Sequence, residues 1–246
     1  MELAGRVALI TGGRRMGAAL ARRLAAGGTD VALVYRESRD AADAAADEVR
    51  ALGQQAITLH ADLADPDACT RVVAATQAAF GRLDILVNMA SIYPEIPFDA
   101  LTVDHWDAQL NVDARAAFLC ARAAVPLMRE TGGGRIINVT DWTAASRRPR
   151  YLGYLPYYVA KHAVIGLTEA LSLELAADRI LVNAIAPGPM LPPDDMSPAE
   201  QDAVTRVTPL GRWGGAEEVS DTVCYLIASE FVTGETIRVD GGRHIQ

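Results

Sequence analysis

Lysine is almost absent from this chain: Lys161 is the only one, and the other 22 of the 23 basic side chains are arginines. A chain that uses arginine for its other fixed positive charges has kept one ammonium, a compact group whose pKa can change in ways that a guanidinium does not allow. Position 161 is therefore a candidate for chemistry.

Cysteine and histidine are also scarce, and their spacing argues against a disulfide framework or a metal centre. The cysteines are odd in number and widely spaced, so we expect buried free thiols. The histidines show no metal-ligand spacing and no accompanying carboxylate cluster, so we expect no metal. These residues are Cys69, Cys120, Cys224, His60, His105, His162 and His244.

Net positive charge and long apolar runs are missing too. A net charge of -8 argues against general binding to nucleic acid. No apolar run reaches the length that spans a membrane, and the first residues lack the order of basic, apolar and small residues found in a signal peptide. We expect a cytoplasmic protein with a small-molecule substrate and with neither nucleic acid nor a membrane as partner.

The chain is rich in short aliphatic runs that alternate with alanine-rich helical patterns. Its 246 residues, 50% of them hydrophobic, suit one domain over residues 1–246. The alternation predicts an α/β fold, a Rossmann-type doubly wound domain with a seven-stranded parallel sheet and helices on both faces. The predicted strands are 7–11, 31–35, 56–59, 85–88, 135–139, 181–185 and 236–239, and the predicted helices are 17–26, 40–52, 66–80, 103–129, 157–177 and 216–228.

One stretch, residues 187–209, interrupts this alternation and is rich in Pro, Asp and Ser. Such an insertion late in the fold is either a substrate loop that covers a site or a plain surface loop.

Tyr157 stands four residues before Lys161, so on a helix the two side chains lie on one face. Apolar residues recur at steps of three and four from 157 to 175, which predicts that helix. We expect the ammonium to lower the phenol pKa from about 10 toward working pH, which would make Tyr157 a general acid or base.

A glycine-containing turn follows the first predicted strand and leads into a helix. It contains Thr11, Gly12 and Gly17. Glycines let the backbone approach a pyrophosphate, and the N-terminus of the helix supplies free amides and the positive end of a dipole. The turn therefore predicts a dinucleotide site.

The end of the second predicted strand indicates which dinucleotide. An NAD site places an acidic residue there, whereas this chain has Tyr35 and Arg36. We expect Arg36 and Arg14 to bind a 2'-phosphate together, so the predicted cofactor is NADPH. Asp62, just past the third strand, suits an adenine amino group or a helix cap.

Motifs along nearly the whole chain resemble those of the short-chain dehydrogenase/reductase family. They are Thr11-Gly12, Asp62-Leu63, Asn88-Met89-Ala90-Ser91, Asn111, Tyr157 with Lys161, Pro187-Gly188, and Val239-Asp240-Gly241-Gly242. The resemblance implies a tyrosine general acid, a lysine that binds the nicotinamide ribose and lowers the tyrosine pKa, and an asparagine, Asn111, that holds a water of a proton relay. It also implies a homotetramer assembled through the helices that contain Asn111 and Tyr157. The implied cofactor-binding residues are Thr11, Gly12, Arg14, Arg15, Met16, Gly17, Tyr35, Arg36, Asp62, Leu63, Asn88, Ala90, Ser91, Tyr157, Lys161, Pro187 and Gly188.

Departures from the family pattern point to a subgroup. Asp141 stands where most members carry a catalytic serine. Together with Arg15, Ser91, Tyr93 and the Asp194-Asp195-Met196 segment, it resembles the pteridine reductases, which reduce dihydropterins and related folates with NADPH. The carboxyl group of Asp141 could form hydrogen bonds with the ring nitrogens and the amino group of a pterin. Tyr93 could stack on the flat pterin ring. The expected substrate contacts are Arg15, Tyr93, Asp141, Trp142, Tyr157 and Met190.

The interval from Asp141 to Tyr157 is about three residues longer than the family norm, so Thr143 or Ser146 could stand in place of Asp141. Three function classes stay open. The first is an NADPH-dependent reductase of a pterin or similar heterocycle, the second a carbonyl reductase of 3-oxoacyl thioesters or small ketones, and the third a non-catalytic NADP(H)-binding sensor.

Overall fold

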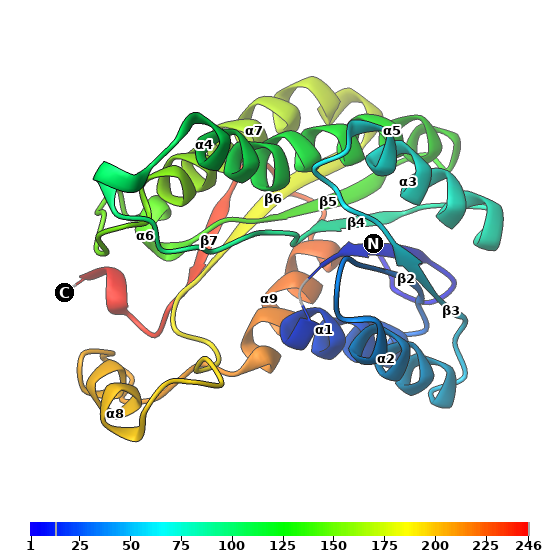
Figure 1. The fold of residues 1–246 in the computed structure, drawn as a ribbon. Helices are drawn as coiled ribbons and strands as arrows, with labels where there is room; N and C mark the ends of the chain where they lie inside the picture. Colours follow the sequence, from blue (N-terminus) through cyan, green and yellow to red (C-terminus); the bar gives the residue numbers. More distant parts are fainter. Residues whose placement is uncertain (13, 246) are drawn as a thin grey trace.

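The computed structural model describes residues 1–12 and 14–245. Seven parallel strands form one sheet in the order β3-β2-β1-β4-β5-β6-β7 (Figure 1). The prediction of a seven-stranded parallel sheet is confirmed. The strands are β1 (Val7–Thr11), β2 (Asp30–Tyr35), β3 (Ala56–His60), β4 (Ile85–Asn88), β5 (Gly134–Val139), β6 (Ile180–Pro187) and β7 (Thr236–Val239).

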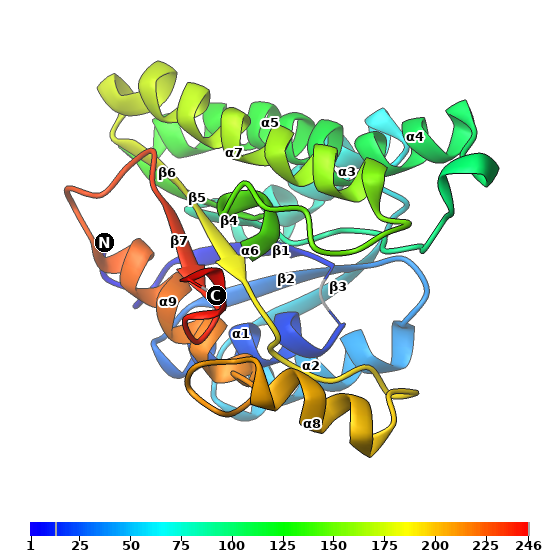
Figure 2. The ribbon, with the colours of Figure 1, turned by 90° about the vertical axis from the view of Figure 1, so that its left-hand side faces the viewer.

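Helices cover both faces of the sheet, as predicted (Figures 1 and 2). One face carries α1 (Arg14–Ala26), α2 (Arg39–Ala51) and α9 (Ala216–Ala228), and the other carries α3 (Pro66–Phe80), α4 (Val103–Leu110), α5 (Ala116–Glu130) and α7 (Leu155–Leu175). Alternate residues of each strand supply the two cores: Ile10 of β1 packs in the core with α1, and its neighbour Leu9 packs in the core with α3 and α5.

The strand order changes direction between β1 and β4, where Thr11 pairs with Asn88 at the carboxyl ends of the two strands. Connections from neighbouring strands leave toward opposite faces at such a point, so a crevice opens beyond the strand ends. The fold therefore places the glycine turn, the loop after β2 and the loop after β4 around one crevice.

The predicted helix 103–129 is interrupted. A π-helical segment, η2 (Asn111–Arg115), separates α4 from α5, and the N–H of Ala116 donates to the carbonyl of Asn111, five residues back. A π-helical turn holds one extra residue and is frequent at functional sites. Apolar periodicity does not reveal it, because the pattern on either side is that of an ordinary helix.

Two short helices lie where we predicted no helix. They are α6 (Trp142–Ala145) and, inside the stretch 187–209, α8 (Pro198–Arg206). In α8 the Ser197 side chain caps the helix reciprocally with Glu200. The Pro, Asp and Ser that indicate a loop are also the residues that begin a helix.

The stretch that contains α8 lies beyond the carboxyl end of β6, on the side of α1 and α9 (Figures 1 and 2). The remaining short helices are the 3-10 turns Phe98–Ala100, Ala176–Asp178 and Arg243–Ile245. Within the described residues, no helix is both long and apolar enough to cross a membrane.

Candidate active site

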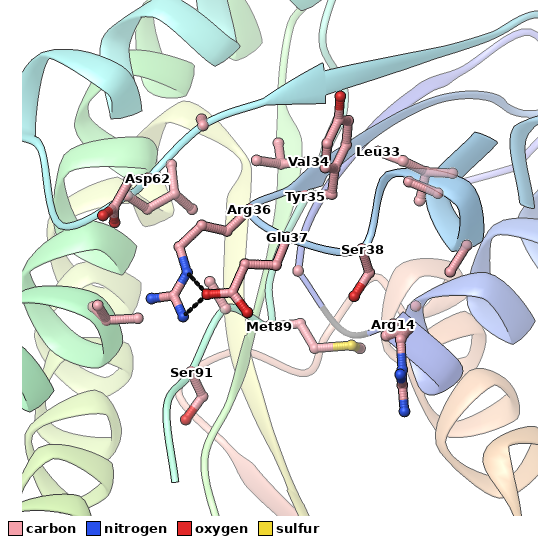
Figure 3. A pocket seen from close by; sticks show the side chains of 18 of the residues that line it. Arg14, Leu33, Val34, Tyr35, Arg36, Glu37, Ser38, Asp62, Met89 and Ser91 are labelled. Carbon is pink, nitrogen blue, oxygen red and sulfur yellow. Dashed lines mark hydrogen bonds and ion pairs between the residues drawn. The ribbon is translucent and has the colours of Figure 1, made fainter. Parts of the chain in front are cut away.

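A cavity of about 370 Å³ occupies the crevice between β1 and β4 (Figure 3). Its walls come from the glycine turn, the end of β2 and the loops after β3 and β4. Nine of the predicted cofactor-binding residues line it, namely Gly12, Arg14, Gly17, Tyr35, Arg36, Asp62, Leu63, Ala90 and Ser91. We name it the dinucleotide cavity.

The glycine turn leaves no room for side chains at two positions. Gly12 has φ of +70°, and a Cβ there would lie 2.9 Å from the Cα of Ala90. A Cβ on Gly17 would lie 2.7 Å from the carbonyl oxygen of Gly12. The Thr11 hydroxyl accepts the N–H of Met89 at 3.1 Å and that of Ala90 at 3.3 Å, which ties the loop after β4 to this turn. Bare backbone next to the start of α1 fits the phosphates of a dinucleotide.

The two arginines predicted to bind a 2'-phosphate together both line the dinucleotide cavity, and each is paired with a different carboxylate. Figure 3 shows Arg36 turned toward Glu37. Arg36 donates from Nε and Nη2 to Glu37 Oε1 at 3.0 and 2.6 Å, and Arg14 Nη2 donates to Asp194 Oδ2 at 2.9 Å. These guanidinium groups are exposed and form ion pairs with nearby carboxylates. Exposed ion pairs of this kind contribute little to the free energy of folding.

A second cavity adjoins the first, and we name it the catalytic cavity. It brings together Asp141, Tyr157 and Lys161 with five further predicted residues, Arg15, Met16, Pro187, Gly188 and Met190. Arg15 Nη1 donates to the carbonyl of Pro192 at 2.9 Å and to Asp194 at 3.3 Å. These contacts hold the stretch 187–209 against the glycine turn and favour its interpretation as a cover over the site.

Asp141 lies beside Tyr157, although the interval between them in the sequence is longer than the family norm. Tyr157 Oη donates to Asp141 Oδ2 at 3.2 Å. Asp141 also caps α6, where its Oδ1 accepts the N–H of Thr143 at 2.7 Å and the Thr143 hydroxyl. The alternatives Thr143 and Ser146 do not reach Tyr157, because Thr143 binds Asp141 and the Ser146 hydroxyl donates to the carbonyl of Trp142.

Lys161 is buried and lies against a carboxylate that the sequence analysis did not identify. Its Nζ lies 3.0 Å from Asp113 Oδ2 and donates to the carbonyl of Val139 at 3.1 Å. The Asp113 side chain is 0% exposed and accepts further hydrogen bonds from Ser91 Oγ at 2.7 Å and Gln109 Nε2 at 3.0 Å. Both carboxylate oxygens of Asp113 therefore have hydrogen-bond or ion-pair partners, which a buried charge needs to be stable.

The predicted lowering of the Tyr157 pKa is wrong for this chain. The pKa of Tyr157 lies well above its ordinary value because burial disfavours the phenolate, and because Asp141, Asp113 and Tyr93 repel it. Lys161 Nζ is 5.4 Å from the ring centre, but Asp113 opposes its charge. The phenol is therefore protonated and suited to donate a proton.

Five predicted residues line neither of these two cavities, namely Thr11, Asn88, Tyr93, Asn111 and Trp142. In the described part of the chain the Asn111 side chain makes no hydrogen bond, and Asp113 rather than Asn111 reaches Lys161. Asn88 is buried at the end of β4, where its Nδ2 donates to Asn138 Oδ1 at 2.9 Å. The buried Trp142 ring lies beneath the guanidinium groups of Arg150 and Arg243, at 5.6 and 5.4 Å from the ring centre.

A third cavity shares Asp141 and Tyr157 with the catalytic cavity. The Tyr93 ring, predicted to stack on a flat substrate, stacks on Tyr154 with ring centres 4.3 Å apart. Sequence reasoning missed Tyr151 and Tyr154 on its wall, although four tyrosines within residues 151–158 were a visible signal. Asp113 gave a weaker signal, a single acidic residue between Val112 and the apolar start of α5.

Comparisons with known proteins agree with this geometry. The family model described as enoyl-(acyl carrier protein) reductase matches residues 12–244. The 3-oxoacyl-[acyl-carrier-protein] reductase of Synechocystis sp. is 36% identical over 98% of this chain and 97% of its own length. A short-chain dehydrogenase from Burkholderia cenocepacia in complex with NADP is 37% identical, covers 99% of each chain and has a TM-score of 0.91. A blue fluorescent protein from a metagenomic library, in complex with NADPH, is 33% identical over 99% of each chain with a TM-score of 0.90.

These relatives give no support to the finer resemblance to the pteridine reductases. They confirm the broader one, because the family model and the similar structures cover nearly the whole chain. The chain belongs to the short-chain dehydrogenase/reductase family.

Proposed function

We propose that the protein is an NADPH-dependent reductase that transfers a hydride to a carbonyl carbon while Tyr157 donates a proton to the carbonyl oxygen. The observation that carries this proposal is the arrangement of the catalytic cavity. Tyr157, held protonated, faces the cavity beside the buried Lys161–Asp113 pair, next to a cavity shaped for a dinucleotide.

The dinucleotide cavity fits NADP(H). The side-chain-free turn at Gly12 and Gly17 would hold the pyrophosphate, and Arg14 or Arg36 would hold the 2'-phosphate. A phosphate dianion can displace Glu37 or Asp194 from an exposed arginine, because exposed ion pairs contribute only about 0–1 kcal/mol. The similar Burkholderia and metagenomic structures hold NADP and NADPH, which supports the same cofactor here. NADPH supplies the hydride when bound.

Side chains of this protein supply the proton and hold the cofactor ribose and the phenol of Tyr157 in position. An ammonium has three donors, and Lys161 uses two on Asp113 and on the carbonyl of Val139. The third is left for the cavity, where it can hold a ribose hydroxyl or the phenol oxygen. Asp141 accepts from Tyr157 Oη at 3.2 Å, and the hydroxyl turns from this acceptor to the carbonyl oxygen when it donates its proton.

The similarity to 3-oxoacyl-[acyl-carrier-protein] reductases supports a carbonyl as the reduced group. One observation favours a second candidate, reduction of a C=N bond in a pterin or related heterocycle. Asp141 places a carboxyl group where a serine would donate to a carbonyl oxygen, and a carboxyl group suits a ring N–H or a basic imine nitrogen better.

NADPH oxidation by the purified protein tests the proposal. The substrates are an acetoacetyl thioester, a small ketone, a dihydropterin and dihydrofolate, with NADH and the Tyr157→Phe variant as controls. Turnover of the thioester or ketone that Tyr157→Phe abolishes supports carbonyl reduction. Selective turnover of the dihydropterin would replace it with the second candidate, and binding of NADPH without turnover of any substrate would contradict both.

A further inference from the structure

Five of the seven tyrosines in the chain line one cavity. They are Tyr93, Tyr151, Tyr154, Tyr157 and Tyr158. This third cavity, the tyrosine cavity, measures about 370 Å³ and meets the catalytic cavity at Asp141 and Tyr157. Whatever occupies it lies directly beside the proton donor.

Two segments distant in sequence build the wall and are fastened to each other. The N–H of Ile96, in the loop after β4, donates to the carbonyl of Gly153, in the loop before α7, at 2.8 Å. The Tyr93 ring stacks on Tyr154 at 4.3 Å and an interplanar angle of 21°, and meets Tyr157 edge-on at 4.6 Å and 78°. The wall thus presents aromatic faces and edges in fixed positions next to the reacting hydroxyl.

The cavity is otherwise apolar. Among its described lining residues, Asp141 and Arg150 are the charged ones, and the Arg150 guanidinium lies over the Trp142 ring. Tyr93 is 53% exposed, yet desolvation by its neighbours raises the pKa of the phenol, so its hydroxyl stays neutral and can donate a hydrogen bond. Phe98 is 75% exposed and Leu152 is 94% exposed at the margin, as expected where an apolar ligand extends from a pocket.

We propose that the tyrosine cavity selects substrates that carry a planar aromatic ring close to the reducible bond, so that the substrate class is that of carbonyl compounds with an aromatic substituent. The inference rests on the proposed function, because it extends the same site. A flat ring can extend the stack of Tyr93 and Tyr154 or lie edge-on to Tyr157. A puckered ring of equal size fills the volume but makes neither contact.

A matched pair of substrates tests the proposal. Phenylacetone and cyclohexylacetone carry the same unconjugated methyl ketone and differ in whether the ring is flat. We expect kcat/KM to favour phenylacetone about three- to tenfold, the range of an aromatic contact. Tyr154→Leu keeps an apolar side chain but removes the aromatic face, so it should bring the ratio close to one. Tyr225→Leu, an exposed tyrosine on α9 outside the cavity, should leave the ratio unchanged.

Calorimetric binding of both ketones to the NADP⁺ complex measures the cavity independently of turnover. Tighter binding of phenylacetone that Tyr154→Leu removes supports the aromatic cavity even if neither ketone is reduced. The proposed function then fails separately, provided that the acetoacetyl thioester is not reduced either. Equal binding and equal kcat/KM of the two ketones would overturn the inference while leaving carbonyl reduction in place. An intact preference in Tyr154→Leu would overturn it as well.

Discussion

Replacing Asp113 by Asn should move the pH range in which the protein works as a reductase. The substitution keeps the size of the side chain and an oxygen that can accept from Gln109 or Ser91, but it leaves the charge of Lys161 unopposed. Asp113 repels the Tyr157 phenolate, so removing its charge lowers the phenol pKa. Reduction requires the protonated phenol, so activity is lost as the pH rises through that pKa. In Asp113→Asn the loss should begin at lower pH.

The distance from Asp113 to the Tyr157 ring sets the size of this shift, because the substitution removes the charge of Asp113. Asp113 Oδ2 lies 3.0 Å from Lys161 Nζ, which lies 5.4 Å from the ring centre, so the removed charge is within about 8 Å of the ring. Two unit charges about 8 Å apart interact by about 2 kcal/mol at an effective dielectric constant of about 20. At about 1.4 kcal/mol per pKa unit this is about one and a half units. Asp141 still opposes the phenolate in the variant, so we expect a downward shift of about one to two pH units.

The assay is the dependence of kcat/KM on pH for NADPH-driven reduction, read at the alkaline limb of the profile. Asp104→Asn is the matched control, because this carboxylate lies in the first turn of α4 and is exposed. NADPH affinity measured by fluorescence separates a change in proton supply from a change in cofactor binding. An alkaline limb that stays in place in Asp113→Asn, with the fold intact, would refute the repulsion assigned between Asp113 and the Tyr157 phenolate.

Three further predictions concern other parts of the site. Asp141→Ser should keep or raise kcat/KM for an acetoacetyl thioester, because serine can donate to the carbonyl oxygen, and should lower it for a dihydropterin by about 100-fold; a parallel response of both substrates in steady-state kinetics would contradict this. Arg36→Ala should raise KM for NADPH about tenfold and leave KM for NADH unchanged, because it removes a charge-assisted contact with the 2'-phosphate; an equal rise for both cofactors would place the phosphate elsewhere. Gly17→Ala sets a Cβ 2.7 Å from the carbonyl oxygen of Gly12 and should lower Tm by about 4–8 °C, from roughly 2 kcal/mol of strain, in a thermal unfolding scan; an unchanged Tm would show that the turn can widen.

The order of strands and helices could be predicted because each strand carries its own local signal. Runs such as Val7–Thr11 and Ile85–Asn88 are buried on both faces, and buried parallel strands read as continuous aliphatic segments. The π-helical segment at Asn111–Arg115 carries no such signal, because it depends on how α4 and α5 pack on their neighbours. Helix α8 was hidden because nine residues are too few to show a clear period.

In the candidate site, too, some features were predictable from the sequence and others were not. Tyr157, Lys161 and Asp141 are predictable from spacing and from the family resemblance, and the structure brings them together. The partners of Arg14 and Lys161 are not, because Asp194 is 180 residues away along the chain and Asp113 reaches Lys161 only through its place in the π-helical segment. Long-range ion pairs depend on the finished fold, and a sequence pattern predicts the charge but not its partner.

The π-helical segment also sets the rotational phase between two helices. One residue more than an α-helical turn rotates everything after it by about 100°. Gln109 before the segment and Asp113 within it meet, while Cys120 and Ala124 after it face the sheet. Deleting one residue here would restore a continuous α-helix. Such a helix could keep either the packing of Cys120 and Ala124 against the sheet or the contact of Asp113 with Lys161, but not both. Relatives that retain this site should therefore vary in residue type along α4 and α5 while keeping the number of residues between them constant.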